Sequence, residues 1–480
     1  MKRAAALLLS TAIASSAFAN ATITIVNADP PAKGFNDPTP AAPVGGNTGT
    51  TLGEQRLIAF RFAADEWAHL INSNVEIVVS ATFSPITRGT DSCNILGAAG
   101  PADFLTNFPN APKQNVWYPV ALANALAGTD LRPDTPDINA QFNALIDSDQ
   151  CTNGKWYYGL DGNHGSDKID LIVVLLHELA HGLGISGTTN LSDGSDEQGF
   201  PSTHELHTLD TSTGLRWDQM TSAQRQTSSL NTGHLVWDGP STRTAANEIL
   251  SNVTTLTVTA PSDLARNFDI GTASFGPRAD KTALTGTIVA AADPADTVGP
   301  TTTDGCSAYT NAEAINGNIS LVDRGTCTFV TKAKNAQAAG AKALVIADNR
   351  RDTCIPPGMA GDDATITIPI MSVSQDDGDA IRAQLANGVT ATLRVDPTTL
   401  AGATNTGLMR LYAPCTLSDG SSVFHWDITA FPNLLMEPSI SGDLTHGVDI
   451  TINQLIDLGW SRAADSGPPS GRKTLKRGHP

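Results

Sequence analysis

The spacing of apolar residues predicts a helix and then a strand near the start of the chain. From Gly53 to Asn72 the apolar positions recur at helical spacing, and they are Leu57, Phe60, Ala64, Trp67 and Leu70. The segment from Val75 to Phe83 is rich in β-branched residues and predicts a strand. Residues 84–165 carry many turn signals and no sustained apolar period, so we expect them to be irregular.

A second helix is expected where an almost wholly apolar run, Ile169 to Leu176, follows a polar segment. Ser166 is a reasonable N-cap for it, because a serine hydroxyl can accept a hydrogen bond from a free amide of the first turn. Acidic residues follow Ser166, as is common in a first helical turn. The apolar run would bury this helix and hold the side chains that follow it in fixed positions.

From about Ser251 to Pro397 the composition shifts to Val, Thr, Ala and Asp, and the pattern predicts short strands. One β-α-β unit is clear within this region. It consists of a strand and turn (Asn318–Gly325), a helix that ends in a glycine (Phe329–Gly340) and a buried strand (Ala343–Asp348). The unit contains no G-x-G-x-x-G sequence, so a nucleotide-binding interpretation is rejected.

The two ends of the chain differ from the rest in composition. Lys2 and Arg3 precede a short apolar stretch, and residues 17–19 form an A-x-A cleavage site, which is typical of an export signal. The stretch is shorter than the roughly 20 apolar residues that span a bilayer. We therefore expect cleavage after Ala19 and a secreted or periplasmic protein without a membrane anchor. The basic tail, residues 463–480, is expected to be disordered.

Charge and cysteine content narrow the possible partners. The formal net charge is -18, which argues against nucleic acids and anionic membranes as partners. An even number of cysteines in an exported chain suggests disulfides, and six cysteines allow 15 pairings, among which spacing alone does not decide. No C-x-x-C pair occurs, so a thiolate zinc site is not expected.

The sequence H-E-L-A-H, residues 177–181, points to metal chemistry. On a helix, His177 and His181 lie one turn apart on the same face and can bind one zinc ion. Glu178 is placed to act on a metal-bound water as a general base. A chance occurrence of this short pattern on a core helix is the alternative. In the longer form of the motif a third histidine stands at the position of Gly187, so the third ligand must come from elsewhere.

Several residues could supply the third ligand. His204 and His207 form an i, i+3 pair, although the polar segment before them suggests a surface loop. Glu248 could donate a carboxylate, but it lies far along the chain from the motif. The favoured candidate is His425, which precedes Met436 by eleven residues.

The sequence around His425 resembles the leishmanolysin-type metzincins, in which a distant third histidine precedes the methionine of a Met-turn. The matching segments are H-W-D at residues 425–427 and L-M-E-P at residues 435–438, and residues 444–460 resemble the closing helix of that family. The resemblance implies that His177, His181 and His425 bind zinc and that Met436 lies beneath the metal. Glu178 would then be the general base.

A second resemblance concerns the β-rich region. Residues 317–349 and 368–385 resemble a protease-associated (PA) domain, which implies an inserted module for substrate recruitment or access without catalytic residues. The expected fold is α+β, with a metzincin-like catalytic domain formed by residues 20–250 and 399–462. An α/β-type PA domain, residues 251–398, would interrupt it.

This organisation implies a disulfide pattern. Cys306 and Cys327 flank the first strand of the module and are expected to pair within it. Cys93 would then pair with Cys151. Cys354 would pair with Cys415 and connect the module to the segment before the third histidine.

The expected function is that of a secreted zinc endopeptidase acting on proteins or peptides. An exported binding or adhesion protein that uses the PA domain and has little or no catalytic activity is the alternative. The retained Glu178 argues against that alternative, because a structural zinc site does not need this carboxylate.

Overall fold

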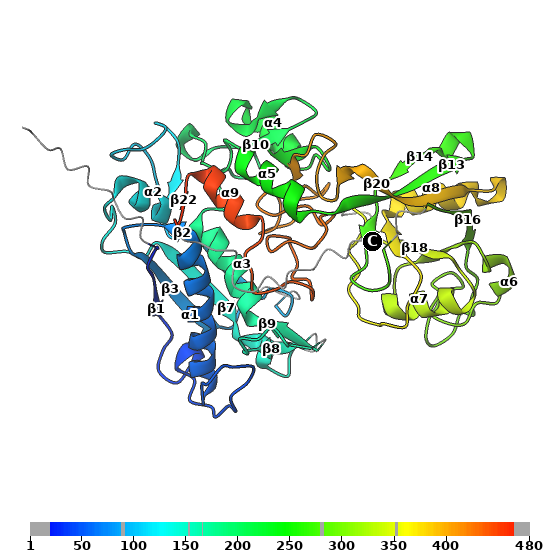
Figure 1. The fold of residues 1–480 in the computed structure, drawn as a ribbon, viewed down its shortest axis with the longest axis horizontal. Helices are drawn as coiled ribbons and strands as arrows, with labels where there is room; N and C mark the ends of the chain where they lie inside the picture. Colours follow the sequence, from blue (N-terminus) through cyan, green and yellow to red (C-terminus); the bar gives the residue numbers. More distant parts are fainter. Residues whose placement is uncertain are drawn as a thin grey trace, which may run out of the picture.

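The computed structural model describes residues 20–87, 92–151, 154–165, 167–278, 283–350 and 354–464. The chain forms a larger body and a smaller body that lie side by side (Figure 1). The first half and the C-terminal segment of the chain build the larger body, and the region between them builds the smaller one. The expected signal peptide and most of the expected disordered tail fall outside the described residues. Among the described helices, none is long and apolar enough to cross a membrane.

A four-stranded sheet with the order β1-β3-β7-β4 forms the base of the larger body. β1 (Ile23–Asn27), β3 (Ile77–Ser84) and β7 (Ile138–Asn143) run parallel, and β4 (Gly97–Pro101) pairs with β7 in the antiparallel direction and forms an edge. β3 alternates buried and partly exposed residues, as a strand with one face on the core should.

Two helices pack together in this body, α1 (Leu52–Leu70) and α3 (Leu171–Leu183), and α3 also contacts β4 and β7. α1 begins at a capping box in which Thr51 and Glu54 each satisfy a backbone amide of the other residue. The prediction for α1 and β3 is confirmed. The predicted N-cap of the second helix was wrong, because the cap of α3 is Asp170, whose side chain accepts a hydrogen bond from Ile172. Lys168–Asp170 forms a short strand, β9, so the helix cannot begin at Ser166.

The expectation that residues 84–165 are irregular was wrong. Besides β4 and β7, the described part of this region contains β5 (Phe104–Leu105), β6 (Tyr118–Pro119), α2 (Val120–Ala127), the 3-10 helix η3 (Ala144–Asp147) and β8 (Lys155–Tyr157). Most of these elements are too short to show a period in the sequence. β4 in addition consists of Gly, Ala and Pro, which carry almost no strand signal of their own.

The larger body is completed by a second sheet and three helices. The sheet has the order β11-β10-β12-β21 and consists of β10 (Thr208–Asp210), β11 (Leu215–Arg216), β12 (Leu235–Trp237) and β21 (Met409–Arg410). The helices are α4 (Ser222–Ser228), α5 (Pro240–Ile249) and α9 (Thr451–Leu458), and α9 packs against α5 and α3. β2 (Ile71–Asn72) pairs with β22 (Ser461–Arg462), which brings the end of the described chain to the end of α1.

An eight-stranded sheet forms the smaller body, in the order β14-β13-β20-β16-β17-β18-β19-β15. Its members are β13 (Asn252–Ala260), β14 (Arg266–Phe268), β15 (Gly271–Thr272), β16 (Leu284–Ala290), β17 (Ile319–Asp323), β18 (Ala343–Ala347), β19 (Ile370–Val373) and β20 (Thr390–Leu400). A short helix, α6 (Ala312–Ile315), precedes β17. The strands β16 to β19 are parallel, which confirms the β-α-β unit.

Two helices cover opposite faces of this sheet. α7 (Phe329–Ala338) contributes Ala333 and Ala336 to one apolar cluster, together with Leu344 of β18. α8 (Gln375–Gln384) contributes Ile381 to a second cluster, together with Val345. Successive residues of β18 therefore face different cores, which explains why the whole strand is buried and apolar.

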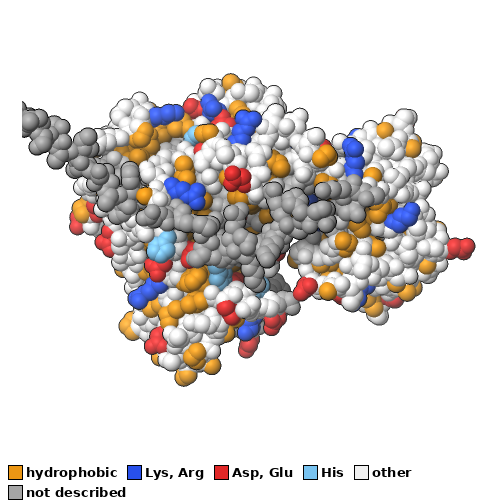
Figure 2. Space-filling model, viewed as in Figure 1, with side chains coloured by type: hydrophobic (Ala, Val, Ile, Leu, Met, Phe, Trp, Pro, Cys, Tyr) orange, Lys and Arg blue, Asp and Glu red, His pale blue; other side chains and the backbone are white. Residues whose placement is uncertain are grey.

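The chain enters and leaves the smaller body at neighbouring points. Ala401 donates a backbone hydrogen bond to the carbonyl of Ser251 (2.9 Å), and β13 pairs with β20 along most of their length. All three predicted disulfides are confirmed, namely Cys93–Cys151, Cys306–Cys327 and Cys354–Cys415. The last one adds a covalent link between the two bodies to the two points where the chain passes between them. On the face shown in Figure 2, acidic and basic side chains are interspersed, so the net negative charge does not gather into one patch there.

Candidate metal centre

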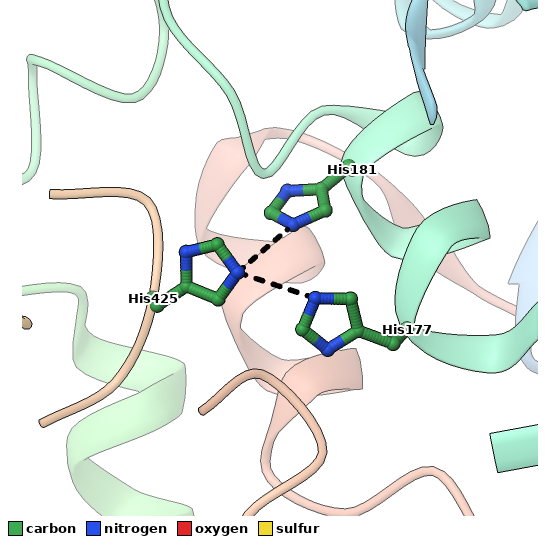
Figure 3. A group of neighbouring side chains, drawn as sticks. All are labelled: His177, His181 and His425. Carbon is green, nitrogen blue, oxygen red and sulfur yellow. Dashed lines mark hydrogen bonds between the residues drawn. The ribbon is translucent and has the colours of Figure 1, made fainter. Parts of the chain in front are cut away.

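Helix α3 presents the two histidines of the H-E-x-x-H sequence toward the third. Almost all of the helix is buried, which follows from its apolar sequence, and its last turn ends at Gly184. His425 arrives from the irregular segment that precedes α9, and its ring faces those of His177 and His181 (Figure 3). The three imidazoles form a group in which one nitrogen of each lies within 4.8 Å of the others.

A side chain at position 187 would force its neighbours to move. A Cβ atom there would lie 2.8 Å from Oε1 of Glu205 and 2.8 Å from Cε1 of Phe424, which is closer than real contacts allow. Phe424 precedes His425 directly. The segment that supplies the third imidazole therefore fills the space that a side chain at position 187 would need.

Backbone carbonyls fix the orientation of all three rings. Nδ1 of His177 donates to the carbonyl of Leu435 (2.6 Å), Nδ1 of His181 to that of Ile185 (2.7 Å), and Nδ1 of His425 to that of Ser421 (2.8 Å). A carbonyl can only accept, so each Nδ1 carries the proton. In a neutral imidazole each Nε2 is then a bare lone pair.

These lone pairs point at one another. Nε2 of His425 lies 3.2 Å from Nε2 of His177 and 3.2 Å from Nε2 of His181, contacts that Figure 3 draws as dashed lines. Two unprotonated nitrogens cannot share a hydrogen bond, so the arrangement needs a cation between them. Neutral imidazoles whose other nitrogen is held by a carbonyl are the form in which histidine binds zinc. The residues present therefore fit a zinc ion.

Burial keeps these histidines neutral. It lowers the pKa of His177 to about 3, with a further contribution from His181, and it lowers the pKa of His181 and His425 as well. The hydrogen bonds from Nδ1 to the carbonyls oppose this shift, because they favour the charged ring. The three Nε2 atoms are thus free of protons at neutral pH.

Glu178 follows His177 directly on α3 and is buried. Burial raises its pKa to about 8, against a hydrogen bond from the backbone of Ala99. Ala99 and Gly97 belong to the edge strand β4, and a Cβ atom at Gly97 would lie 3.1 Å from Cγ and 3.2 Å from Oε1 of Glu178. Gly97 thus leaves room for the carboxylate. No signal in the sequence pointed to Gly97, because the residues of β4 do not predict a strand.

The segment around Met436 is fixed by three hydrogen bonds. The amide of Trp426 donates to the carbonyl of Met436 (2.7 Å), and the amide of Leu434 donates to Oε1 of Glu437 (2.9 Å). The amide of Leu435 donates to Oδ2 of Asp449 (2.6 Å), and the carbonyl of this same residue holds His177. Met436 is fully buried. Its position beneath a metal stays a prediction, and Asp449 is a second residue that the sequence analysis missed.

The alternative ligands do not belong to this group. The expectation that His204 lies in a surface loop was wrong, because His204 and Glu205 are buried. His204 packs against Phe424 and Trp237, with ring centroids 5.0 and 4.8 Å away. His207 lies at the other end of its segment and pairs with Asp238 (3.4 Å).

Glu248 is exposed on α5 and is not part of the histidine group either. The assignment of His425 as third ligand is compatible with this geometry and remains a prediction.

Two family models match parts of the chain. Residues 284–381 match the PA domain, and residues 48–197, which include the H-E-x-x-H sequence, match a family described as SPBPB7E8-like. The PA match lies within the smaller body, so the chain contains a PA domain whose flanking sequences both belong to the larger body.

Curated relatives match the chain over short stretches. Signal peptide peptidase-like 2 from Arabidopsis thaliana is 38% identical over 88 residues, which are 18% of this chain and 15% of that protein. Aminopeptidase YwaD from Bacillus subtilis is 40% identical over 70 residues, 14% of this chain and 15% of that protein. The chain thus spans about a seventh of the length of these relatives.

A solved structure, the zinc aminopeptidase BSAP from Bacillus subtilis, is 23% identical over 32% of this chain and 36% of that chain, with a TM-score of 0.23. An aminopeptidase from Aneurinibacillus sp. strain AM-1 is 22% identical over 31% of each chain, also with a TM-score of 0.23.

These comparisons overturn the assignment to the leishmanolysin-type metzincins, which was wrong. The PA model matches residues 284–381 of this chain, and the relatives include an aminopeptidase, YwaD, with no metzincin among those described above. The physical reason is that H-E-x-x-H, H-W-D and L-M-E-P each constrain only a few atoms around a metal, and such local sequences do not determine the fold that carries them. The chain is an α/β protein with an inserted PA domain, and its larger body is not metzincin-like.

Proposed function

We propose that the protein is a zinc-dependent peptidase. The observation that supports this most is the convergence of three bare Nε2 atoms next to Glu178. Three histidines and one open position for water are a common catalytic zinc arrangement, whereas structural zinc sites are closed by four protein ligands.

The side chains of the site have two roles in this proposal, metal binding and proton transfer. His177, His181 and His425 would hold the zinc through Nε2. Bound there, zinc supplies a water whose pKa is lowered toward 7 and polarises the peptide carbonyl. The Glu178 carboxylate takes the proton from the attacking water and delivers it to the leaving amine as the peptide C–N bond breaks. A nearby positive charge favours the ionised carboxylate, which offsets the effect of burial on the pKa of Glu178.

Two cleavage modes are open to such a site. The comparisons give no support to the endopeptidase specificity expected from the sequence, since the relative YwaD is an aminopeptidase by name. An N-acetylated peptide is a substrate only for an enzyme that cleaves without a free amino terminus. The matching peptide with a free amino terminus serves both modes.

The assay uses the purified full chain and this pair of peptides, with mass spectrometry of the products. We expect hydrolysis that a chelator abolishes and that added zinc restores. Release of the first residue from the free peptide alone would identify an aminopeptidase, and internal cleavage of both peptides an endopeptidase. Absence of hydrolysis of either peptide by the zinc-loaded protein would contradict the proposal and favour an exported binding protein.

A further inference from the structure

A pocket of about 180 Å³ lies where the two bodies meet, away from the histidine group. We call it the seam pocket. Thr254, Asp269 and Arg278 line it from the PA side, and Gly402, Arg410 and Thr429 line it from the larger body. The proposed peptidase chemistry uses none of these residues.

Arg278 is a half-buried cation that forms no ion pair with any carboxylate of the described residues. Its guanidinium carbon lies 3.5 Å from the ring centroid of Phe431, and Nη2 donates to the hydroxyl of Thr254 (3.3 Å). Nη1 is buried and has no hydrogen-bond partner in the described part of the chain. Burial lowers the pKa of this guanidinium to about 10, with no opposing contribution from a carboxylate. An uncompensated charge of this kind destabilises the folded protein unless an anion meets it.

Arg410 is the second cation on the wall. Its backbone is fixed by hydrogen bonds to Gly402 (2.8 Å) and from Asp427 (3.0 Å). Nε of Arg410 is buried and lacks a hydrogen-bond partner among the described residues. The charge of Arg410 lowers the pKa of Asp427, whereas burial, the larger effect, raises it. The pocket thus has two guanidinium groups with unused donors.

Two carboxylates on the wall limit the charge of a ligand. Asp396 accepts hydrogen bonds from the amide of Thr398 (2.9 Å), the hydroxyl of Thr398 (2.6 Å) and the hydroxyl of Thr399 (3.3 Å). Its carboxylate is therefore hydrogen-bonded within the local turn. Asp269 is exposed. Together with the buried Asp427 near Arg410, these carboxylates disfavour a doubly charged phosphate more than a singly charged anion.

We propose that the seam pocket binds a carboxylate group of a peptide. The planar guanidinium fork suits a carboxylate because it can donate two parallel hydrogen bonds. Thr429 follows His425 by four residues, so the pocket wall lies at most about 14 Å along the chain from the third imidazole. A peptide held by its carboxylate can therefore reach the metal centre. That the carboxylate belongs to a peptide follows from the proposed peptidase function.

The test measures binding without turnover. Full-length protein carrying Glu178→Gln is titrated calorimetrically with acetyl-pentaalanine as the free acid and as the C-terminal amide. We expect the acid to bind about tenfold tighter than the amide, as one charge-assisted contact would give. This comparison needs no change in the pocket. Equal affinities would overturn the proposal.

Variants locate the effect. Arg278→Gln in the same background should abolish the preference for the acid, and Arg410→Gln should weaken it. Arg394→Gln should retain it, because Arg394 is exposed on β20 and does not line the pocket. A preference that persists in Arg278→Gln would contradict the assignment.

Inorganic phosphate that displaces the acid peptide more effectively than acetate would contradict the choice of a carboxylate. If the wild-type protein hydrolyses no peptide but still prefers the acid over the amide in an Arg278-dependent way, only the proposed function is contradicted. The two failures are therefore distinguishable.

Discussion

At the scale of single residues, the candidate centre depends on which nitrogen of each imidazole carries the proton. The carbonyls of Leu435, Ile185 and Ser421 decide this for all three rings. The histidines on α3 could be predicted from the sequence because a four-residue spacing on a helix has one geometric outcome. The carbonyls that accept from these rings could not be predicted from the sequence. Every residue has a backbone carbonyl, and its position depends on the folded chain.

His425→Ala should lower zinc affinity by at least about a hundredfold, since it removes one of three ligands. His207→Ala should leave the affinity unchanged, because His207 pairs with Asp238 outside the group. Competition with a fluorescent chelator measures both. The ligand assignment would be contradicted if His207→Ala lost zinc and His425→Ala retained it.

Gly97→Ala should impair catalysis without removing the metal. The new methyl group would displace the Glu178 carboxylate, and misplacement of a catalytic group by an ångström costs roughly tenfold to a hundredfold in rate. Gly100→Ala is the matched control on the same strand, because a Cβ atom there meets nothing within 4 Å. Zinc content and peptide hydrolysis are measured on both variants. Equal rates for the two would show that β4 does not shape the site.

The buried His204 should make the metal-free protein sensitive to acid. Burial lowers the pKa of His204 to about 3, whereas the unfolded chain takes up this proton near pH 6.5. The unfolded state thus binds more protons between these values, and the free energy of unfolding falls as the pH falls from 6.5 toward 3. At pH 5 the loss is about 2 kcal/mol for this one residue.

Urea unfolding of chelator-treated protein at pH 7 and pH 5 measures this loss. His204→Gln should show a smaller loss than the wild type, and His69→Gln, which changes an exposed histidine, should match the wild type. If the free energy of unfolding falls equally in all three proteins between pH 7 and pH 5, His204 is not the cause of the acid sensitivity.

At the scale of elements, the long periodic segments were predictable and the short ones were not. α1 and α7 follow from their apolar spacing, and β18 from its unbroken apolar run. β4 escaped prediction because its residues have almost no side chains, yet this strand lies against α3, the helix that carries the H-E-x-x-H sequence. The turn at residues 434–437 depends on Asp449, which acts only through the backbone of a distant segment.

Asp449→Ala should loosen this turn and with it the carbonyl that holds His177. Loss of such a supporting hydrogen bond typically weakens metal binding by about tenfold to a hundredfold. Asp443→Ala is the control, because Asp443 is exposed and accepts from the side chain of Asn433 in the same region. Zinc affinity is measured for both variants by chelator competition. An unchanged zinc affinity in Asp449→Ala would contradict the supporting role of Asp449.

At the scale of the whole molecule, the PA domain leaves and rejoins the larger body through hydrogen-bonded residues, Ser251 and Ala401. The sequence predicted this insertion because the PA-like motifs occupy one continuous stretch. It did not predict the seam pocket, whose walls come from both bodies, and it gave a wrong family for the larger body, since metal-binding motifs do not specify a fold.

Replacement of residues 252–400 by a short Gly/Ser linker, together with Cys415→Ser, should leave zinc binding intact. The ends to be joined are already adjacent, and loop-closure entropy changes slowly with length. The cysteine is changed because its partner, Cys354, is removed. Zinc content and thermal unfolding are measured. A soluble, folded deletion protein that cannot hold zinc would show that the PA domain supports the metal centre.

The central claim is that three histidines hold a zinc ion on which Glu178 acts. Parallel determination of zinc content and peptide hydrolysis in the wild type and in Glu178→Ala tests it most directly. The account predicts about one zinc per chain in both proteins, with hydrolysis reduced by at least about a hundredfold in the variant. Hydrolysis at the wild-type rate by Glu178→Ala, or a wild type that binds no zinc, would contradict it.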